Sequence, residues 1–152
     1  MEVGMFFSGK KLKLVKEAYE SIINHAKDSY PEECCGILIG NSMRERKVFY
    51  VERSTNINKD RARDRYIIDP REINLADKQA RSQSLDIMGF YHSHPDHPDS
   101  PSEFDREMGQ SGYSYVIVSV NGKGEVSVKS WIFKEEGEPF KEEGIKVGQG
   151  IV

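Results

Sequence analysis

The chain has 152 residues, a formal net charge of −3 and 31% charged residues, which is the length of one domain with enough material for a hydrophobic core. A charge this close to neutral gives no reason to expect a nucleic-acid partner, because such proteins usually carry a strongly basic surface. No run approaches the roughly 18–20 apolar residues of a membrane span, and the N-terminus lacks the apolar core of a signal peptide. We therefore expect a single cytoplasmic domain over residues 1–152 that binds neither nucleic acid nor membrane.

The only two cysteines, Cys34 and Cys35, are adjacent in the sequence. Neighbouring residues rarely form a disulfide, because the bridge needs a particular separation and orientation of the two Cα–Cβ bonds. We expect two free thiols, which fits a reducing compartment.

The first third of the chain predicts one helix and two strands. Apolar residues recur every three or four positions over residues 10–29, which indicates an amphipathic helix. Residues 34–40 form a short apolar run typical of a buried strand, and residues 47–53 alternate as a second strand.

Residues 55–65 are polar and are expected to form a solvated loop. Its small basic cluster consists of Arg61, Arg63 and Arg65. Asp60 precedes this cluster and Asp64 interrupts it. A brief strand over residues 66–68 is predicted to follow. Asp69 before Pro70 is then typical of a capped helix start, and the helix should run to about Ser84.

The rest of the chain predicts a strand over residues 86–94, a loop over 95–101 and a short helix over 102–108. A hairpin over 113–120 and 125–133 should follow, and the Glu-, Gly- and Lys-rich residues 134–152 are expected to form a mobile tail. This order predicts a mixed α/β domain with a core over residues 10–133, in which one sheet packs between helices.

The segment Gly89–Asp105 contains three of the four histidines and suggests a metal site. His92 and His94 should lie on one face of a strand, because side chains alternate along it. Prolines at every third position of the following loop should stiffen its return and bring Asp105 beside the histidines. Two imidazoles and one carboxylate would hold one Zn²⁺ ion, with water as the fourth ligand.

Each part of this pattern also has a simpler interpretation. Ser102 and Asp105 fit an ordinary helix cap, and a His-x-His pair is more often a surface or core pair than a pair of ligands. A hydrolase would also need a general base, for which Glu33 is the candidate and Glu32 the alternative. Ser102 could donate a hydrogen bond to an oxyanion. The remaining polar residues of the loop are expected on a solvated rim: Asp96, His97 and Asp99.

Together these residues resemble the JAMM metalloproteases, also called the JAB1/MPN/Mov34 or MPN-plus family, in their compact prokaryotic form. The resemblance rests on His92-Ser93-His94-Pro95, on the spacing to Ser102-Glu103-Phe104-Asp105, and on the upstream Pro31, Glu33, Cys35 and Gly36. It covers roughly residues 12–133. By resemblance, His92, His94 and Asp105 would bind zinc, Glu33 would act as the base, and Ser102 would stabilise the oxyanion.

The resemblance also implies a cytidine-deaminase-like mixed β-sheet flanked by helices. The expected reaction is hydrolysis of the peptide, isopeptide or amide bond after the C-terminal Gly-Gly of a ubiquitin-like β-grasp protein. A sulfur-carrier protein is the expected substrate, with release of cysteine or trimming of a tail. The alternatives are removal of ubiquitin-like modifiers from conjugates, a small-molecule or DNA-repair relative, and a scaffold without activity. The composition also permits a homodimer.

Overall fold

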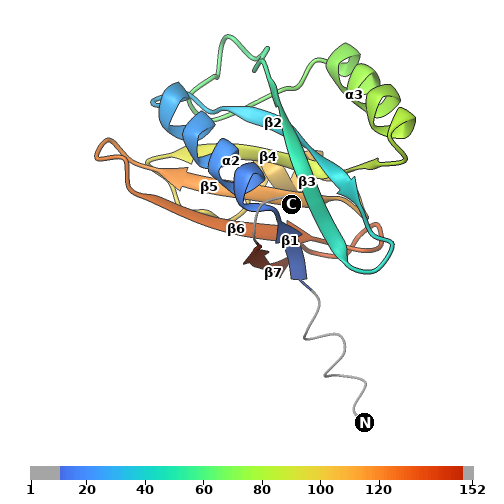
Figure 1. Cartoon of the computed structure of the whole chain (residues 1–152). Coiled ribbons are helices and arrows are strands. Elements are labelled where there is room, and N and C mark those ends of the chain that lie inside the picture. Colours follow the sequence, from blue (N-terminus) through green and yellow to red (C-terminus); the bar gives the residue numbers. More distant parts are fainter. Residues whose placement is uncertain (1–10, 149–152) are drawn as a thin grey trace.

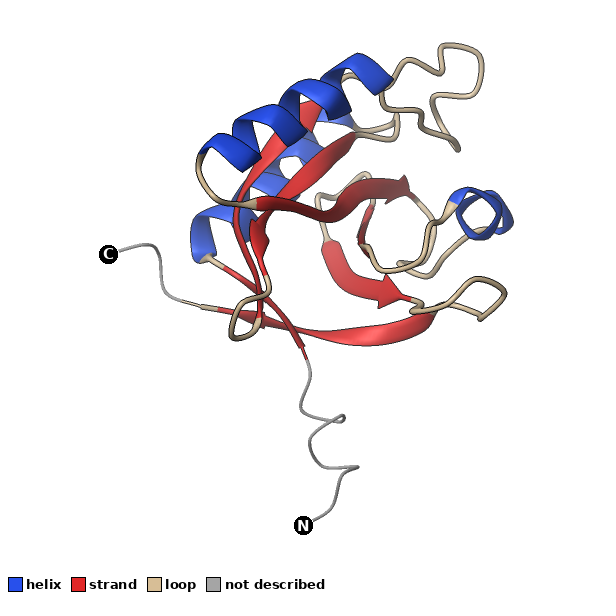
Figure 2. Ribbon diagram, turned by 90° about the vertical axis from the view of Figure 1, so that its right-hand side faces the viewer, coloured by secondary structure: helices blue, strands red, loops and turns tan. Residues whose placement is uncertain are grey.

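The computed structural model describes residues 11–148, and its framework is one mixed sheet that closes on itself (Figures 1 and 2). The strands neighbour one another in the order β1, β3, β2, β4, β5, β6, β7, and a parallel β1–β7 pair closes the barrel. The other parallel pairs are β1–β3 and β4–β5. The bounds of the strands are β1 Lys11–Leu14, β2 Cys35–Asn41, β3 Arg46–Ser54, β4 Asp86–Pro95, β5 Ser114–Val120, β6 Val126–Ile132 and β7 Lys141–Val147.

The first predicted helix begins later than its apolar pattern indicated. Lys11–Leu14 form strand β1, and helix α2 then runs from Lys16 to Ser29. Leu12 and Leu14 fit both interpretations, because a strand also buries alternate residues; both side chains are fully buried. Residues 11–14 form a strand because β3 and β7 pair with them and satisfy their backbone hydrogen-bonding groups. The spacing of apolar residues had assigned this segment to the helix.

Two helices cover opposite faces of the central strands. Helix α2 packs with Leu38 in one buried cluster. Helix α3 (Pro70–Ser82) packs with Ile37 and Ile39 in another. Leu38 faces one helix, and Ile37 and Ile39 face the other, because successive side chains of a strand point to opposite faces of the sheet. The predicted arrangement of a sheet between helices is therefore present in this part of the barrel (Figure 1).

The short strand predicted over residues 66–68 is absent from the described structure, where Ile68 forms only an isolated bridge with Asn56. The tail prediction was wrong at residues 141–147, which form strand β7 between β6 and β1. Glu143 of this strand is buried and accepts hydrogen bonds from Ser114, Ser130 and Arg46. A polar strand of this kind escapes hydropathy patterns because backbone pairing and the ion pair of Glu143 with Arg46 help to hold it in place, together with the packing of Ile145 against the core.

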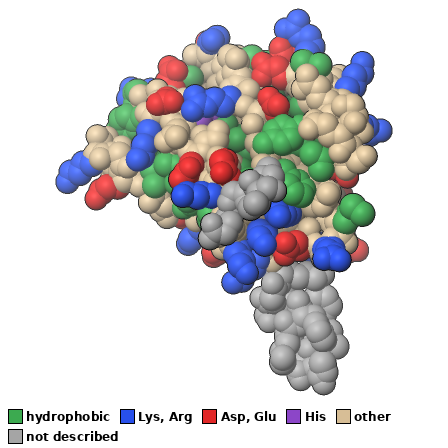
Figure 3. Space-filling view, viewed as in Figure 1, with side chains coloured by type: hydrophobic (Ala, Val, Ile, Leu, Met, Phe, Trp, Pro, Cys, Tyr) green, Lys and Arg blue, Asp and Glu red, His purple; other side chains and the backbone are tan. Residues whose placement is uncertain are grey.

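Helix α4 (Glu103–Met108) returns the chain to the end of β4 after the proline-rich loop. Within the described range, no helix combines the length and apolar character needed to cross a membrane. On the face shown in Figure 3, acidic and basic side chains are interspersed. The fold therefore places the carboxyl end of β4 and the start of α4 beside each other, where the predicted metal ligands lie.

Candidate metal centre

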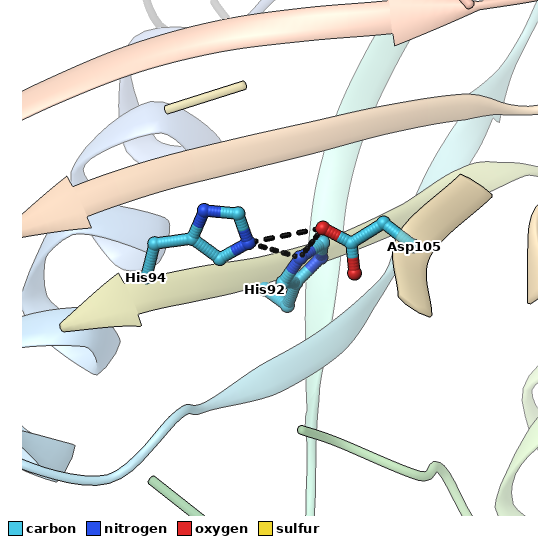
Figure 4. Close-up of side chains that lie close together, drawn as sticks. All are labelled: His92, His94 and Asp105. Atoms are coloured by element: carbon cyan, nitrogen blue, oxygen red, sulfur yellow. Dashed lines mark hydrogen bonds and ion pairs between the residues drawn. The ribbon is translucent and has the colours of Figure 1, made fainter. Parts of the chain in front are cut away.

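His92, His94 and Asp105 converge at the end of β4, with the histidines on the strand and the carboxylate on α4 (Figure 4). The Nε2 atoms of the two histidines lie 3.1 Å apart. Asp105 Oδ2 lies 3.1 Å from His92 Nε2 and 3.0 Å from His94 Nε2. A tetrahedral zinc ion with bonds near 2.05 Å would separate its ligand atoms by roughly 3.3 Å. The three atoms therefore have nearly the spacing that such an ion requires.

The hydrogen bond at the far side of His94 fixes which of its nitrogens is free to bind a cation. Nδ1 lies 2.7 Å from the carbonyl oxygen of Pro98, which can only accept, so Nδ1 carries the proton. In the neutral ring, Nε2 then presents a lone pair toward the carboxylate oxygen of Asp105. Two facing acceptors repel each other unless a cation lies between them, so the donor set fits a metal ion.

An aromatic ring packs against the imidazole of His92, whereas His94 is held through a hydrogen bond of its Nδ1. The His92 imidazole stacks on Tyr66 with ring centroids 4.3 Å apart and planes inclined by 22°. The ring is buried, and its Nδ1 has no hydrogen-bond partner among the described residues. Burial lowers the pKa of His92, although Asp105 opposes the shift. The imidazole is therefore neutral at neutral pH, which is the form that can bind a metal.

Ser102 and Asp105 form a reciprocal cap at the start of α4. The Ser102 Oγ accepts a hydrogen bond from the amide of Asp105, and the amide of Ser102 donates to Asp105 Oδ2 at 2.9 Å. Burial opposes ionisation of Asp105, whereas the Ser102 amide, which donates to Oδ2, lowers the pKa of its carboxyl. The simpler cap interpretation is thus correct for both residues, and it coexists with their convergence on the histidines.

Glu33 lies just before β2 and is only 5% exposed. It lines a cavity of about 400 Å³ together with His94 and Ser102. Burial, followed by the negative charges of Asp105 and Asp64, raises the pKa of Glu33 to about 9. A carboxyl group with such a pKa keeps its proton at neutral pH, and the charge of a cation at the neighbouring ligand atoms would lower this pKa again. Its neighbour Glu32 is exposed and does not line this cavity.

The loop after β3 holds Glu33 in place through its backbone. The Glu33 amide donates to the carbonyl of Ala62 at 2.7 Å, and Asn56 Nδ2 donates to the Glu33 carbonyl at 3.3 Å. The same Asn56 amide group donates to the carbonyl of Arg65 at 2.9 Å, and its Oδ1 accepts from the amide of Ile67. One side chain therefore joins the candidate base to the segment that carries Tyr66.

The return loop is anchored more firmly than its sequence indicated. Asp99, expected on a solvated rim, is buried; it accepts a hydrogen bond from Ser127, and its carbonyl accepts from the indole of Trp131 at 2.9 Å. Asp96 and His97 are exposed, as predicted. The loop therefore gains rigidity from β6 in addition to its prolines.

The buried carboxyl of Glu33 predicts a specific pH dependence of stability for the metal-free protein. Its pKa is about 9 when folded against 4.5 in the reference state, so the folded chain keeps a proton that the unfolded chain releases. The free energy of unfolding therefore falls as pH rises through this window, by up to about 1.4 kcal/mol per pH unit. We expect the stability gain from Glu33→Gln to widen by about 2.6 kcal/mol between roughly pH 5.5 and 7.5.

Urea denaturation at several pH values measures this difference, and Glu32→Gln is the matched control because Glu32 is exposed. All other titrating groups are shared by the wild type and the variant and cancel in the difference. A gap that stays constant with pH would show that Glu33 ionises normally in the folded protein.

Sequence patterns identified the candidate ligands but not the residues that orient them. Tyr66, Asn56 and the Pro98 carbonyl act on the site through contacts between segments far apart in the sequence.

The chain is similar to two curated proteins and to several solved structures. It is 32% identical over 145 residues to a protein named desampylase from Haloferax volcanii, covering 92% of this chain and 99% of that one. A desampylase from Pyrococcus furiosus is 30% identical over 123 residues, covering 81% and 82%.

A solution structure from Desulfitobacterium hafniense matches with a TM-score of 0.78 and 30% identity, covering 91% of this chain and 93% of that one. A solution structure from Salinibacter ruber matches with a TM-score of 0.69 and 34% identity, covering 90% of this chain and 92% of that one. A JAB1/MPN domain protein from Archaeoglobus fulgidus shares the fold at 22% identity and a TM-score of 0.54, over 92% of this chain and 100% of that one. The model of the prokaryotic homologues of the JAB domain matches residues 15–134. The chain therefore belongs to the family of prokaryotic JAB domains, and it has the JAB1/MPN fold.

Proposed function

We propose that this protein is a zinc-dependent metallopeptidase that hydrolyses the bond after the C-terminal Gly-Gly of a ubiquitin-like β-grasp protein. The convergence of His92, His94 and Asp105 beside the buried Glu33 carries the proposal. Family membership and the two relatives named desampylase support hydrolysis of bonds to a ubiquitin-like modifier. Processing of a sulfur-carrier protein, expected from the sequence, is the second candidate substrate.

Three residues would hold the ion: His92 and His94 through Nε2, and Asp105 through Oδ2. When bound, zinc supplies a Lewis acid that lowers the pKa of water and polarises a carbonyl group. Glu33 takes a proton from the attacking water and gives it to the leaving amine as the C–N bond breaks. Burial and Asp105 raise the pKa of Glu33 in the metal-free protein, and the charge of a bound cation would oppose that rise, so that the carboxylate needed to accept the proton would be available.

Ser102 lines the same cavity and is placed to stabilise charge on the substrate carbonyl. Its Oγ already accepts a hydrogen bond from the Asp105 amide at 3.1 Å, so the hydroxyl proton remains to be donated toward a developing oxyanion. The cap and the proposed catalytic role therefore use different parts of one hydroxyl group.

The proposed reaction predicts cleavage of the organism's own β-grasp proteins. We expect the zinc-loaded protein to release the leaving group from tail-extended, cysteine-adducted or isopeptide-linked forms, with mass spectrometry reporting which bond is cut. A chelator should stop the reaction, and added zinc should restore it. If none of these substrates is cleaved, the protein is better explained as a scaffold without activity.

We also propose a single domain over residues 1–152, which is supported by the match of the Haloferax relative over 92% of the chain. Cytoplasmic location and a homodimer stay predictions.

A further inference from the structure

Arg65 occupies a different environment from the one its sequence context predicted. The side chain is half-buried, and its guanidinium carbon lies 4.7 Å from the centre of the Phe104 ring. Phe104 precedes Asp105 in α4, so this contact ties Arg65 to the helix that carries the candidate ligand. Arg65 also lines the cavity that contains Glu33, His94 and Ser102. It is therefore part of the candidate site rather than of a solvated loop.

The positive charge of Arg65 has no acidic partner within residues 11–148. Asp64 is close enough for Arg65 to contribute to the lowering of its pKa, but both of its carboxylate oxygens are bound by Arg61, Oδ1 through Nε at 3.0 Å and Oδ2 through Nη2. Glu103, the other exposed acidic residue of the cavity, forms no ion pair in the described structure. Arg65 is thus a cation whose guanidinium N–H groups bind no partner among the described residues, although its backbone amide donates to Arg61.

The contact with Phe104 determines which ligand suits this cation. An aromatic ring covers one face of the guanidinium and leaves the N–H groups at its edge available. Those N–H groups form a planar fork that matches the two oxygens of a carboxylate. In the proposed substrate, the residues before the scissile bond are glycines, which carry no side chain. A carboxylate that lies next to the scissile bond and reaches Arg65 must therefore belong to the leaving group.

We propose that Arg65 is a specificity-determining residue that binds a carboxylate of the leaving group next to the bond being hydrolysed. This inference rests on the proposed function and assigns the substrate feature that the site selects. Two sources share this chemistry: the α-carboxylate of a single released amino acid, and an acidic side chain beside the modified lysine of a conjugate.

Two matched substrate pairs distinguish these sources. In the first pair, a tail ending in Gly-Gly is joined to alanine with either a free α-carboxylate or an α-carboxamide. In the second pair, the tail is joined to a lysine side chain in a blocked peptide with either Glu or Gln as the neighbour. We expect the wild-type protein to prefer the charged member of at least one pair by about tenfold in kcat/KM, mainly through KM.

Arg65→Gln should remove this preference, so that the charged and neutral members of each pair are hydrolysed with the same kcat/KM. Arg65→Lys should keep part of it, because it retains the charge but loses the planar fork. Arg63→Gln is the matched control from the same loop, since Arg63 is exposed and lies outside the cavity. Thermal unfolding and zinc content establish that each variant is folded and loaded. A purely structural role would slow all four substrates equally.

The inference is overturned if the wild-type protein shows no preference in either pair, a result that needs no variant. If the protein cleaves none of the substrates, the proposed function fails separately, and equilibrium binding of the same peptides to the zinc-loaded Glu33→Gln protein then tests Arg65. Tighter binding of the charged peptides that disappears in the Glu33→Gln/Arg65→Gln protein supports the inference. Equal binding of both members, or no binding at all, overturns it.

Discussion

We expect the Glu33→Gln protein to bind zinc as the wild type does and to hydrolyse its substrate about 10²–10⁴ times more slowly, the usual contribution of a general base. Glutamine nearly matches glutamate in shape, so the backbone hydrogen bonds of residue 33 to Ala62 and Asn56 should persist. Its amide cannot carry a proton from water to the leaving amine. The loss should therefore appear in kcat, while the KM for the substrate changes little.

Glu32→Gln separates the role of Glu33 from a general loss of negative charge at this position. Glu32 is the neighbouring residue and is exposed, so its substitution should leave the rate within about twofold of wild type. Zinc content measured by atomic absorption, together with initial rates for the same substrate, decides the outcome. A fully active Glu33→Gln protein would remove Glu33 from the proposed mechanism.

The second large effect is expected for the three candidate ligands. His92→Ala and Asp105→Ala should each lower zinc affinity by at least about 10²-fold, because a two-ligand remnant binds zinc weakly. Asp105→Ala should also weaken the start of α4, since its carboxylate accepts the hydrogen bond of the Ser102 amide. Metal content after gel filtration and competition with a chromogenic chelator measure the loss.

His97→Ala is the matched control for the histidine variants. His97 lies in the loop after β4, three residues beyond His94, and lines the same cavity, but it is exposed and is absent from the cluster of converging ligand atoms. We expect it to keep its zinc. Stoichiometric metal in both His92→Ala and Asp105→Ala would show that the ion, if bound, lies elsewhere.

Ser102→Ala tests whether one hydroxyl has two functions. Loss of the cap should destabilise the protein by about 1 kcal/mol, and loss of the oxyanion donor should reduce kcat by about 10²–10³-fold. Ser102→Asp offers a matched comparison, because aspartate can still cap a helix but its carboxylate cannot donate a hydrogen bond. A variant with the cap restored and hydrolysis still impaired would support the catalytic role.

The sequence was sufficient to locate the residues that converge in the structure. Histidines two apart on a strand must share a face, and a short stiff loop limits how far the next helix can lie from the strand. For these reasons the spacing of His92, His94 and Asp105 predicted their convergence. The buried strands and the α3 cap at Asp69 were likewise local properties, because periodicity and capping depend on residues close in the sequence.

Features that depend on distant partners could not be derived in this way. Leu12 and Leu14 belong to a strand because β3 and β7 pair with it, and Glu143 is buried because Ser114, Ser130 and Arg46 provide its hydrogen bonds. A sequence window contains none of these partners, so its pattern favoured a longer helix and a mobile tail. Closure of the barrel is therefore a property of the assembled chain.

The same distinction applies within the site. The sequence by itself indicated which side chains are candidate metal ligands, because this follows from residue type and local spacing, whereas Glu33 was favoured over Glu32 as the candidate base through the family resemblance. The tertiary structure alone decided the burial that raises the pKa of Glu33, the stacking of Tyr66 on His92, and the placement of Arg65 against Phe104. Each of these depends on desolvation or contact between segments that meet only when the sheet closes and the loop after β3 packs beside α4.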